Sequence, residues 1–290
     1  MMKCRLAFLM IGLLCITSMN AQRKRAFMVG ISHYDQALTG YQWNNIHGVE
    51  DVRLIVPLLT KQGFEITTCL DGEATYKNIT ERLNQFVNKI TKGDIVYIHF
   101  STHGQPVEDL NGDEEDGWDE AIVPIDAYKI YNKGVYEGKK HLIDDKLNSY
   151  VKQLREKMGQ AGFLYVVIDA CHAGTSSRGQ DDVVRGTRVG FTYHNKIYKP
   201  IVNKKSHYQL ESSAKLAQVM FLEACRADQV NIEVKVGEGR YGALSYNISQ
   251  ALLQEPLGRN PSSFLKSVKD AITKTGKWSN NQNLVVETSY

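Results

Sequence analysis

Hydrophobic positions along the chain follow two spacings, one typical of buried strands and one typical of amphipathic helices. Continuous apolar runs predict strands at 25–31, 64–70, 94–100, 163–168 and 216–222. Apolar residues spaced three and four apart predict helices at 49–61, 76–90, 143–158, 244–253 and 262–272. Strands and helices that alternate in this way predict an α/β fold, with a mostly parallel central sheet and helices on both faces.

Two stretches interrupt this alternation, and both are predicted to be long loops. The first, residues 102–142, is acidic and contains glycine and proline. The second, residues 173–215, is rich in basic residues: Arg178, Arg185, Arg188, Lys196, Lys199, Lys204 and Lys205. A compact domain rarely carries loops of this length without a use for them.

The first residues of the chain have the pattern of a secretory signal peptide. Lys3 and Arg5 precede an apolar run at 6–16, which is too short to span a bilayer comfortably, and a small residue, Ala21, follows. We therefore expect 1–21 to be a signal peptide, 22–290 to form one domain, and the protein to be exported to the periplasm or secreted. A lipoprotein anchor at Cys15 is less favoured, because bulky Leu14 precedes it.

Composition narrows the class of protein. Hydrophobic residues make up 42% of the chain and charged residues 23%, which is ordinary for a folded protein without a transmembrane segment. The formal net charge of +3 is too small to indicate a nucleic-acid partner. Cys69, Cys171 and Cys225 remain after the expected cleavage. Three is an odd number, so at least one free thiol is expected in an exported protein.

Two of the predicted strands end in residues that can do chemistry. One ends in S-T-H-G, with His103 and Gly104, and another in I-D-A-C-H-A-G, with Cys171 and His172. If these strands are neighbours, an imidazole lies beside a thiol, and the backbone N–H groups of Gly104 and Cys171 could bind an oxyanion. A buried structural cysteine is the simpler alternative. A metal site at Cys171 and His172 is disfavoured because C-x-x-C and H-x-x-x-H spacings are missing, and His172 is expected to face away.

These motifs, together with I-H-G-V-E-D-V, D-G-W-D-E-A-I-V-P-I-D, I-D-D-K-L and F-L-E-A-C-R-A-D-Q, resemble the metacaspases and related caspase-like cysteine peptidases. The resemblance covers roughly residues 24–255. It implies the caspase-type three-layer sandwich, with His103 and Cys171 as the catalytic dyad. The position of Gly48 is a cysteine in many metacaspases, so no second nucleophile is expected there. Cys225 and Cys69 are interpreted as core residues.

The residue two before the nucleophile predicts the specificity. Caspases have Q-A-C at this point, whereas this chain has Asp169-Ala170-Cys171. A carboxylate there attracts a basic side chain and repels an acidic one. Metacaspases cleave after Arg or Lys, and the resemblance implies that Asp51, Ser101 and, more weakly, Asp228 also line the pocket. Alternatively, Asp51 is a surface acid near a helix N-terminus.

The acidic stretch raises the question of calcium. An EF-hand is disfavoured, since Glu114 stands where its glycine should be. By resemblance, Asp144, Asp145 and Asp119 are candidate ligands for Ca²⁺, but Arg178 replaces a further acid of the family. The other interpretation is a solvated loop that frames the cleft, with no cofactor required.

The expected function is therefore a cysteine endopeptidase that cleaves protein or peptide substrates after Arg or Lys. Its loop after Cys171 is basic, so the enzyme could also cut itself there. Two alternatives remain open. One is a catalytically inactive caspase-like module that binds basic peptides, and the other is a thiol redox or metal-binding protein.

Overall fold

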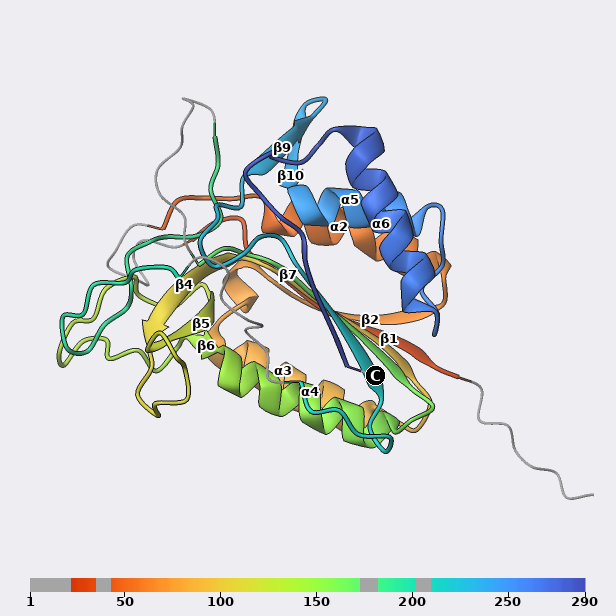
Figure 1. The fold of residues 1–290 in the computed structure, drawn as a ribbon, viewed down its shortest axis with the longest axis horizontal. Coiled ribbons are helices and arrows are strands. Elements are labelled where there is room, and N and C mark those ends of the chain that lie inside the picture. Colours follow the sequence, from red (N-terminus) through yellow and green to blue (C-terminus); the bar gives the residue numbers. More distant parts are fainter. Residues whose placement is uncertain (1–21, 35–42, 173–181, 202–209, 290) are drawn as a thin grey trace, which may run out of the picture.

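The structure is a computed structural model that describes residues 22–34, 43–172, 182–201 and 210–289 (Figure 1). The expected signal peptide and Arg178 lie outside the described residues. Within the described part, no helix is both long enough and apolar enough to cross a membrane.

A six-stranded sheet forms the middle layer, in the order β11-β8-β7-β3-β1-β2. Neighbouring strands from β8 to β2 pair in parallel, and β11 is antiparallel to β8. The bounds are β1 Lys24–Gly30, β2 Phe64–Leu70, β3 Ile95–Ser101, β7 Phe163–Asp169, β8 Gln218–Glu223 and β11 Val285–Ser289. The sheet is mostly parallel, as predicted, and β11 is an addition that the apolar pattern did not indicate.

Helices cover both faces of the sheet and complete the three-layer sandwich (Figure 1). One face packs against α2 Gly48–Lys61, α5 Ala243–Leu252 and α6 Pro261–Thr275. The other packs against α3 Tyr76–Lys89 and α4 Asp144–Met158. Every residue of the central strands β3 and β7 is buried, which explains why both read as continuous apolar runs.

The helices α3 and α6 each begin after a residue whose side chain caps the first turn. The Thr75 side chain accepts a hydrogen bond from the N–H of Asn78 and caps α3. At α6, Pro261 occupies the first turn, the Asn260 side chain caps it, and Gly276 follows the last turn with a left-handed φ of 61°.

The prediction that residues 102–142 form a loop was wrong. They contain a three-stranded antiparallel sheet of β4 His103–Glu108, β5 Trp118–Val123 and β6 Leu142–Ile143. The strands are short, and Pro106 lies in the edge strand β4, so neither apolar alternation nor length signalled them. A second small element, the hairpin of β9 Glu233–Val236 and β10 Gly239–Gly242, was also not predicted.

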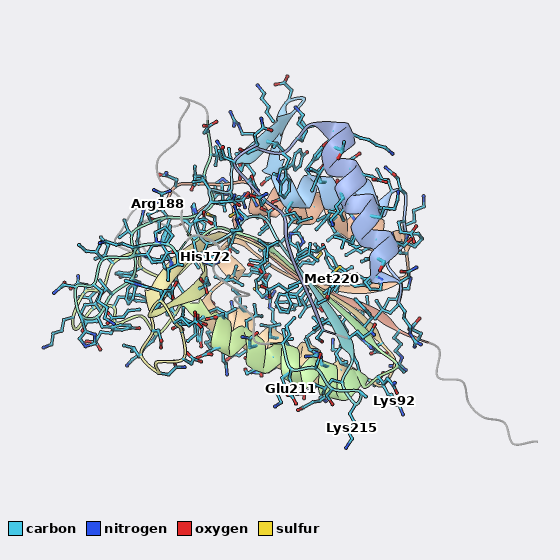
Figure 2. All side chains as sticks on the ribbon, viewed as in Figure 1. Lys92, His172, Arg188, Glu211, Lys215 and Met220 are labelled. Atoms are coloured by element: carbon cyan, nitrogen blue, oxygen red, sulfur yellow. The ribbon has the colours of Figure 1, made fainter. Side chains whose placement is uncertain are left out.

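Strand register brings the two chemically interesting strand ends side by side. β3 and β7 are neighbours, and Ser101 pairs with Asp169 at their carboxyl ends. Figure 2 shows His172 and Arg188 toward this end of the molecule, with Lys92 and Lys215 toward the opposite end. Ligand sites of open parallel sheets form at the carboxyl ends of strands, which is where the candidate site lies.

Candidate functional site

His103 begins β4, two residues after the end of β3, and is held in a fixed orientation. Its ring stacks on Trp43, with centroids 5.0 Å apart, and its Nε2 lies 2.8 Å from the carbonyl oxygen of Asn44. A neutral ring would therefore carry its proton on Nε2 and donate it to this carbonyl. Nδ1 has no hydrogen-bond partner among the described residues. Burial lowers the pKa of His103 to about 4, so the ring is neutral at physiological pH.

Cys171 lies just past the end of β7 and is fully buried. Its thiol is 2.8 Å from the carbonyl oxygen of Gln229. Cys225, which follows β8, packs against it, and the adjacent Cys171 thiol together with burial raises the pKa of Cys225 well above its usual value. Cys225 is thus a buried residue, as interpreted, but one in contact with the predicted nucleophile.

The backbone N–H groups predicted to bind an oxyanion point at a single carbonyl of the chain itself. The carbonyl oxygen of Arg185 accepts hydrogen bonds from the N–H of Cys171, at 2.9 Å, and from the N–H of Gly104, at 3.3 Å. A Cβ on Gly104 would lie 2.6 Å from the carbonyl oxygen of Cys171, and one on Gly186 only 1.9 Å from it. Both positions therefore require glycine for the backbones to approach this closely.

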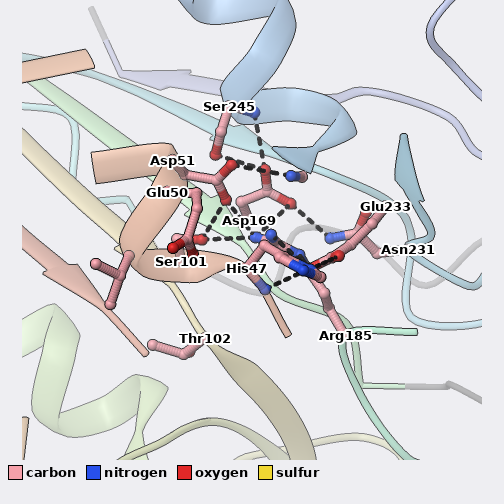
Figure 3. A network of polar contacts seen from close by, with 12 residues as sticks. His47, Glu50, Asp51, Ser101, Thr102, Asp169, Arg185, Asn231, Glu233 and Ser245 are labelled. Atoms are coloured by element: carbon pink, nitrogen blue, oxygen red, sulfur yellow. Dashed lines mark hydrogen bonds and ion pairs between the residues drawn. The ribbon is translucent and has the colours of Figure 1, made fainter. Parts of the chain in front are cut away.

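The side chain of Arg185 is fully buried among acids that come from different elements (Figure 3). Its Nη1 lies 2.6 Å from Asp51 on α2 and 2.5 Å from the hydroxyl of Ser101 at the end of β3. The same nitrogen is 3.8 Å from Asp169 on β7. Its Nε and Nη2 donate to one oxygen of Glu233 on β9, at 3.0 and 2.8 Å. The predicted pocket residues Asp51, Ser101 and Asp169 are thus brought together around a guanidinium.

The backbone on either side of Arg185 is also bound. The N–H of Arg185 donates to the carbonyl of Asn231, and the N–H of Glu233 donates to the carbonyl of Val183. Residues 183–185 therefore run alongside the segment that leads into β9, in the manner of an added strand. Farther along, Phe191 is fully buried and exchanges backbone hydrogen bonds with β4.

Burial and ion pairing shift the pKa values of Asp51 and Glu233 in opposite directions. Burial raises the pKa of Asp51 to about 7, against the attraction of Arg185. Burial would also raise the pKa of Glu233, but Arg185 and His47 outweigh it and lower that pKa to about 2. Asp169 is held by other groups: the N–H and hydroxyl of Ser245 and the side-chain amide of Asn231 donate to its carboxylate.

Comparison with known proteins assigns the family. A family model described as the caspase domain matches residues 23–287, which is most of the chain. The chain belongs to this caspase-domain peptidase family.

Curated relatives agree with this assignment. The chain is 30% identical over 166 residues to Metacaspase-1B of Aspergillus fumigatus and 35% identical over 166 residues to Metacaspase-1B of Aspergillus terreus. Each match covers 53% of this chain, and the matched regions span 36% and 39% of the two relatives. A solved protein of Geobacter sulfurreducens has the same fold, with a TM-score of 0.63, 18% identity and coverage of 92% of this chain and 93% of that chain.

The family is one of cysteine-type peptidases, and the chain spans little more than a third of the length of the two metacaspases. Membership of this family argues against the alternative of a thiol redox protein or a metal site at Cys171 and His172. At Gly48, a Cβ would lie 2.2 Å from the carbonyl oxygen of Ser101, so the backbone leaves no room for a side chain at this position.

Several residues around the pocket were not foreseen from the sequence, and one candidate is placed elsewhere. Arg185 was noted only as one of many basic residues in its loop, and Glu233, Asn231 and Ser245 carried no recognisable motif. Asp228, in contrast, pairs with Arg226 at 3.7 Å and is not among the groups that contact Arg185. His172 packs its ring against Gly104 instead of turning away from the site.

A second group of carboxylates lies outside this pocket, in the acidic stretch 102–142. Ligand oxygens of Asp109, Asp113 and Asp119 all lie within 4.8 Å of one another. Burial and acidic neighbours raise the pKa of Asp119 to about 7 and that of Asp144 to about 9, and Asp144 is almost fully buried. One oxygen of Asp144 has no hydrogen-bond partner among the described residues, whereas Asp145 accepts a hydrogen bond from Asn111. This donor set of crowded carboxylate oxygens suits a hard cation such as Ca²⁺.

Proposed function

We propose that the protein is a cysteine endopeptidase that cleaves after Arg or Lys, and that the Arg185–Gly186 bond is its own first substrate. One observation carries the proposal: Arg185 places its side chain among three carboxylates while its carbonyl oxygen accepts hydrogen bonds from Cys171 and Gly104. A peptide bound for cleavage needs both features at once, a recognised side chain and a polarised carbonyl beside the nucleophile.

The reaction follows from the positions of the groups. The Cys171 thiolate attacks the carbonyl carbon of Arg185, and the oxygen gains negative charge between the two N–H groups that already hold it. His103, anchored through Nε2, carries the thiol proton on Nδ1 to the nitrogen of Gly186. The bond between Arg185 and Gly186 breaks and leaves a thioester. Water then hydrolyses this thioester, which releases a carboxylate at Arg185 and restores the thiol.

The same pocket would accept a basic residue of another protein once Arg185 has left it. Three clustered carboxylates repel an acidic side chain, so cleavage after Asp is not expected. A panel of fluorogenic peptides that differ only in Arg, Lys or Asp before the scissile bond tests this. Cleavage after Arg or Lys that disappears in Cys171→Ala supports the proposal. Cleavage after Asp, or activity that survives Cys171→Ala, contradicts it.

Calcium binding at the acidic stretch is a second part of the proposal. Asp109, Asp113 and Asp119 would supply carboxylate oxygens, with Asp144 and Asp145 nearby as further candidates. Isothermal titration with CaCl₂ should show binding that Asp119→Asn removes and Glu115→Gln, a change at an exposed acid of the same stretch, leaves intact. Equal heats for all three proteins would remove the calcium site from the proposal.

Export through the signal peptide is a third part, supported by the sequence pattern of residues 1–21. Expression of the full chain in a bacterial host, followed by N-terminal sequencing of the exported protein, tests it. Cleavage near Ala21 is expected, and an uncut chain that stays in the cell would count against it.

A further inference from the structure

The pocket contains an acid that the sequence did not indicate, and its contacts are specific to a guanidinium. Glu233 accepts from both Nε and Nη2 of Arg185 through one oxygen, Oε1. Asp51 and Ser101 lie on the other side and contact Nη1. The planar fork of donors is thus held along two edges, by acids on β9 and on α2 (Figure 3).

Lysine cannot reproduce this arrangement. Its single ammonium group ends an unbranched stem and has no nitrogen at the position of Nε. If that ammonium reached Asp51, no N–H from the stem would face Glu233. The side chain of Glu233 is completely buried, so the loss of the two donors that Arg185 supplies to its carboxylate is costly.

Glu233 is itself held by a neighbour. The side-chain Nδ1 of His47, the residue before α2, lies 2.5 Å from Oε2 of Glu233, and the backbone N–H of His47 donates to Oε1 at 2.7 Å. With Oε2 occupied, Oε1 is the oxygen turned toward the arginine. The backbone N–H of Glu233 also donates to the carbonyl of Val183. The strand β9 therefore both aligns the segment before Arg185 and carries the acid that binds the arginine side chain.

We propose that Glu233 makes this pocket selective for arginine over lysine, and that His47 is the positioning residue that keeps Glu233 in place. The inference rests on the proposed function and narrows its substrate class from basic residues to arginine. Loss of two hydrogen bonds to a buried carboxylate corresponds to a preference on the order of 100-fold in kcat/KM for Arg over Lys.

The experiment measures the ratio of kcat/KM for two peptides that differ only in Arg or Lys before the scissile bond. Both are assayed on the same preparation, so the ratio is independent of the fraction of enzyme that has cleaved itself. Glu233→Gln should reduce the ratio to below about 5, chiefly through loss of Arg cleavage. His47→Gln should reduce it to an intermediate value, whereas a purely structural defect would slow both peptides equally. Glu238→Gln, at an exposed acid of the same hairpin, should retain the wild-type ratio.

A second measurement tests the inference without a change to Glu233 or His47, in case those variants are too inactive to give a ratio. Arg185→Lys in the otherwise wild-type chain should slow self-cleavage at this bond by a factor similar to the peptide ratio. Wild-type enzyme that cleaves both peptides equally, a wild-type ratio in Glu233→Gln, or unchanged self-cleavage in Arg185→Lys would overturn the inference alone. A folded wild-type protein that cleaves after neither basic residue would overturn the proposed function as well.

Discussion

Replacement of Arg185 by glutamine is the change that most directly tests self-cleavage. The native guanidinium is fully buried and lies within 3 Å of carboxylates of both Asp51 and Glu233. Glutamine is neutral, so these buried acids lose their cationic partner. Truncation of one member of a buried, hydrogen-bonded charge pair costs about 2–5 kcal/mol. That cost opposes docking of the scissile bond, and it converts to self-cleavage that is roughly 30-fold to 4,000-fold slower.

The assay is a time course on denaturing gels, with mass spectrometry of the fragments. Wild type should yield one fragment that ends at Arg185 and one that begins at Gly186, with a rate independent of protein concentration because the bond is held within the same chain. Arg188→Gln removes an equal charge from an exposed position three residues away and should cleave at the wild-type rate. Cleavage of Arg185→Gln within threefold of wild type, or a new N-terminus elsewhere, would falsify the assignment of this bond.

Three further changes test other parts of the molecule. Asp51→Asn should flatten the pH profile of self-cleavage. With Arg185 in the pocket, burial raises the pKa of Asp51 to about 7, so the self-cleavage rate of wild type should rise as this carboxyl ionises between about pH 6 and 8, and a profile unchanged in the variant would contradict this. Burial lowers the pKa of His141 to about 4, below its value in the unfolded chain. In the Cys171→Ala protein, His141 alone should therefore lower the free energy of unfolding by roughly 3 kcal/mol as the pH drops from about 6.5 to 4. Urea titrations should show a shallower fall for His141→Gln but not for exposed His33→Gln. Phe191→Ala in the same background should lower the free energy of unfolding by about 3–5 kcal/mol, measured in urea, because this ring is fully buried; a loss below 1 kcal/mol would show that the ring does not anchor the loop.

The sandwich could be predicted from the sequence because its signals are local. Apolar spacing placed α2 within one residue of its observed start, and the strand that ends at Asp169 reads as apolar because both of its faces are covered. That the strand ends next to His103 and Cys171 meet could also be predicted, because neighbouring parallel strands have their carboxyl ends at one edge of the sheet.

The occupied pocket could not be predicted because its contacts join distant segments. Arg185 is one of several basic residues in its loop, and nothing within the loop distinguishes it from Arg188. What selects it is the backbone around it: the N–H groups of Cys171 and Gly104, and the segment that contains Asn231. Such pairings between segments that lie far apart in sequence leave no periodic signal in either one.

Buried carboxylates that share one pocket destabilise the folded state, and the chain's own substrate residue can offset that cost. Asp51, Asp169 and Glu233 converge in a region closed to solvent, and their mutual repulsion opposes the compact state unless a cation joins them. Arg185 supplies that cation from within the chain and, through the hydrogen bonds to its carbonyl, keeps the scissile bond at Cys171. The interactions that stabilise the uncut fold are then the same ones that bind a substrate. Self-cleavage would weaken the fold at the moment it opens the pocket, so the cut protein should be less stable than Cys171→Ala until a basic peptide takes the place of Arg185.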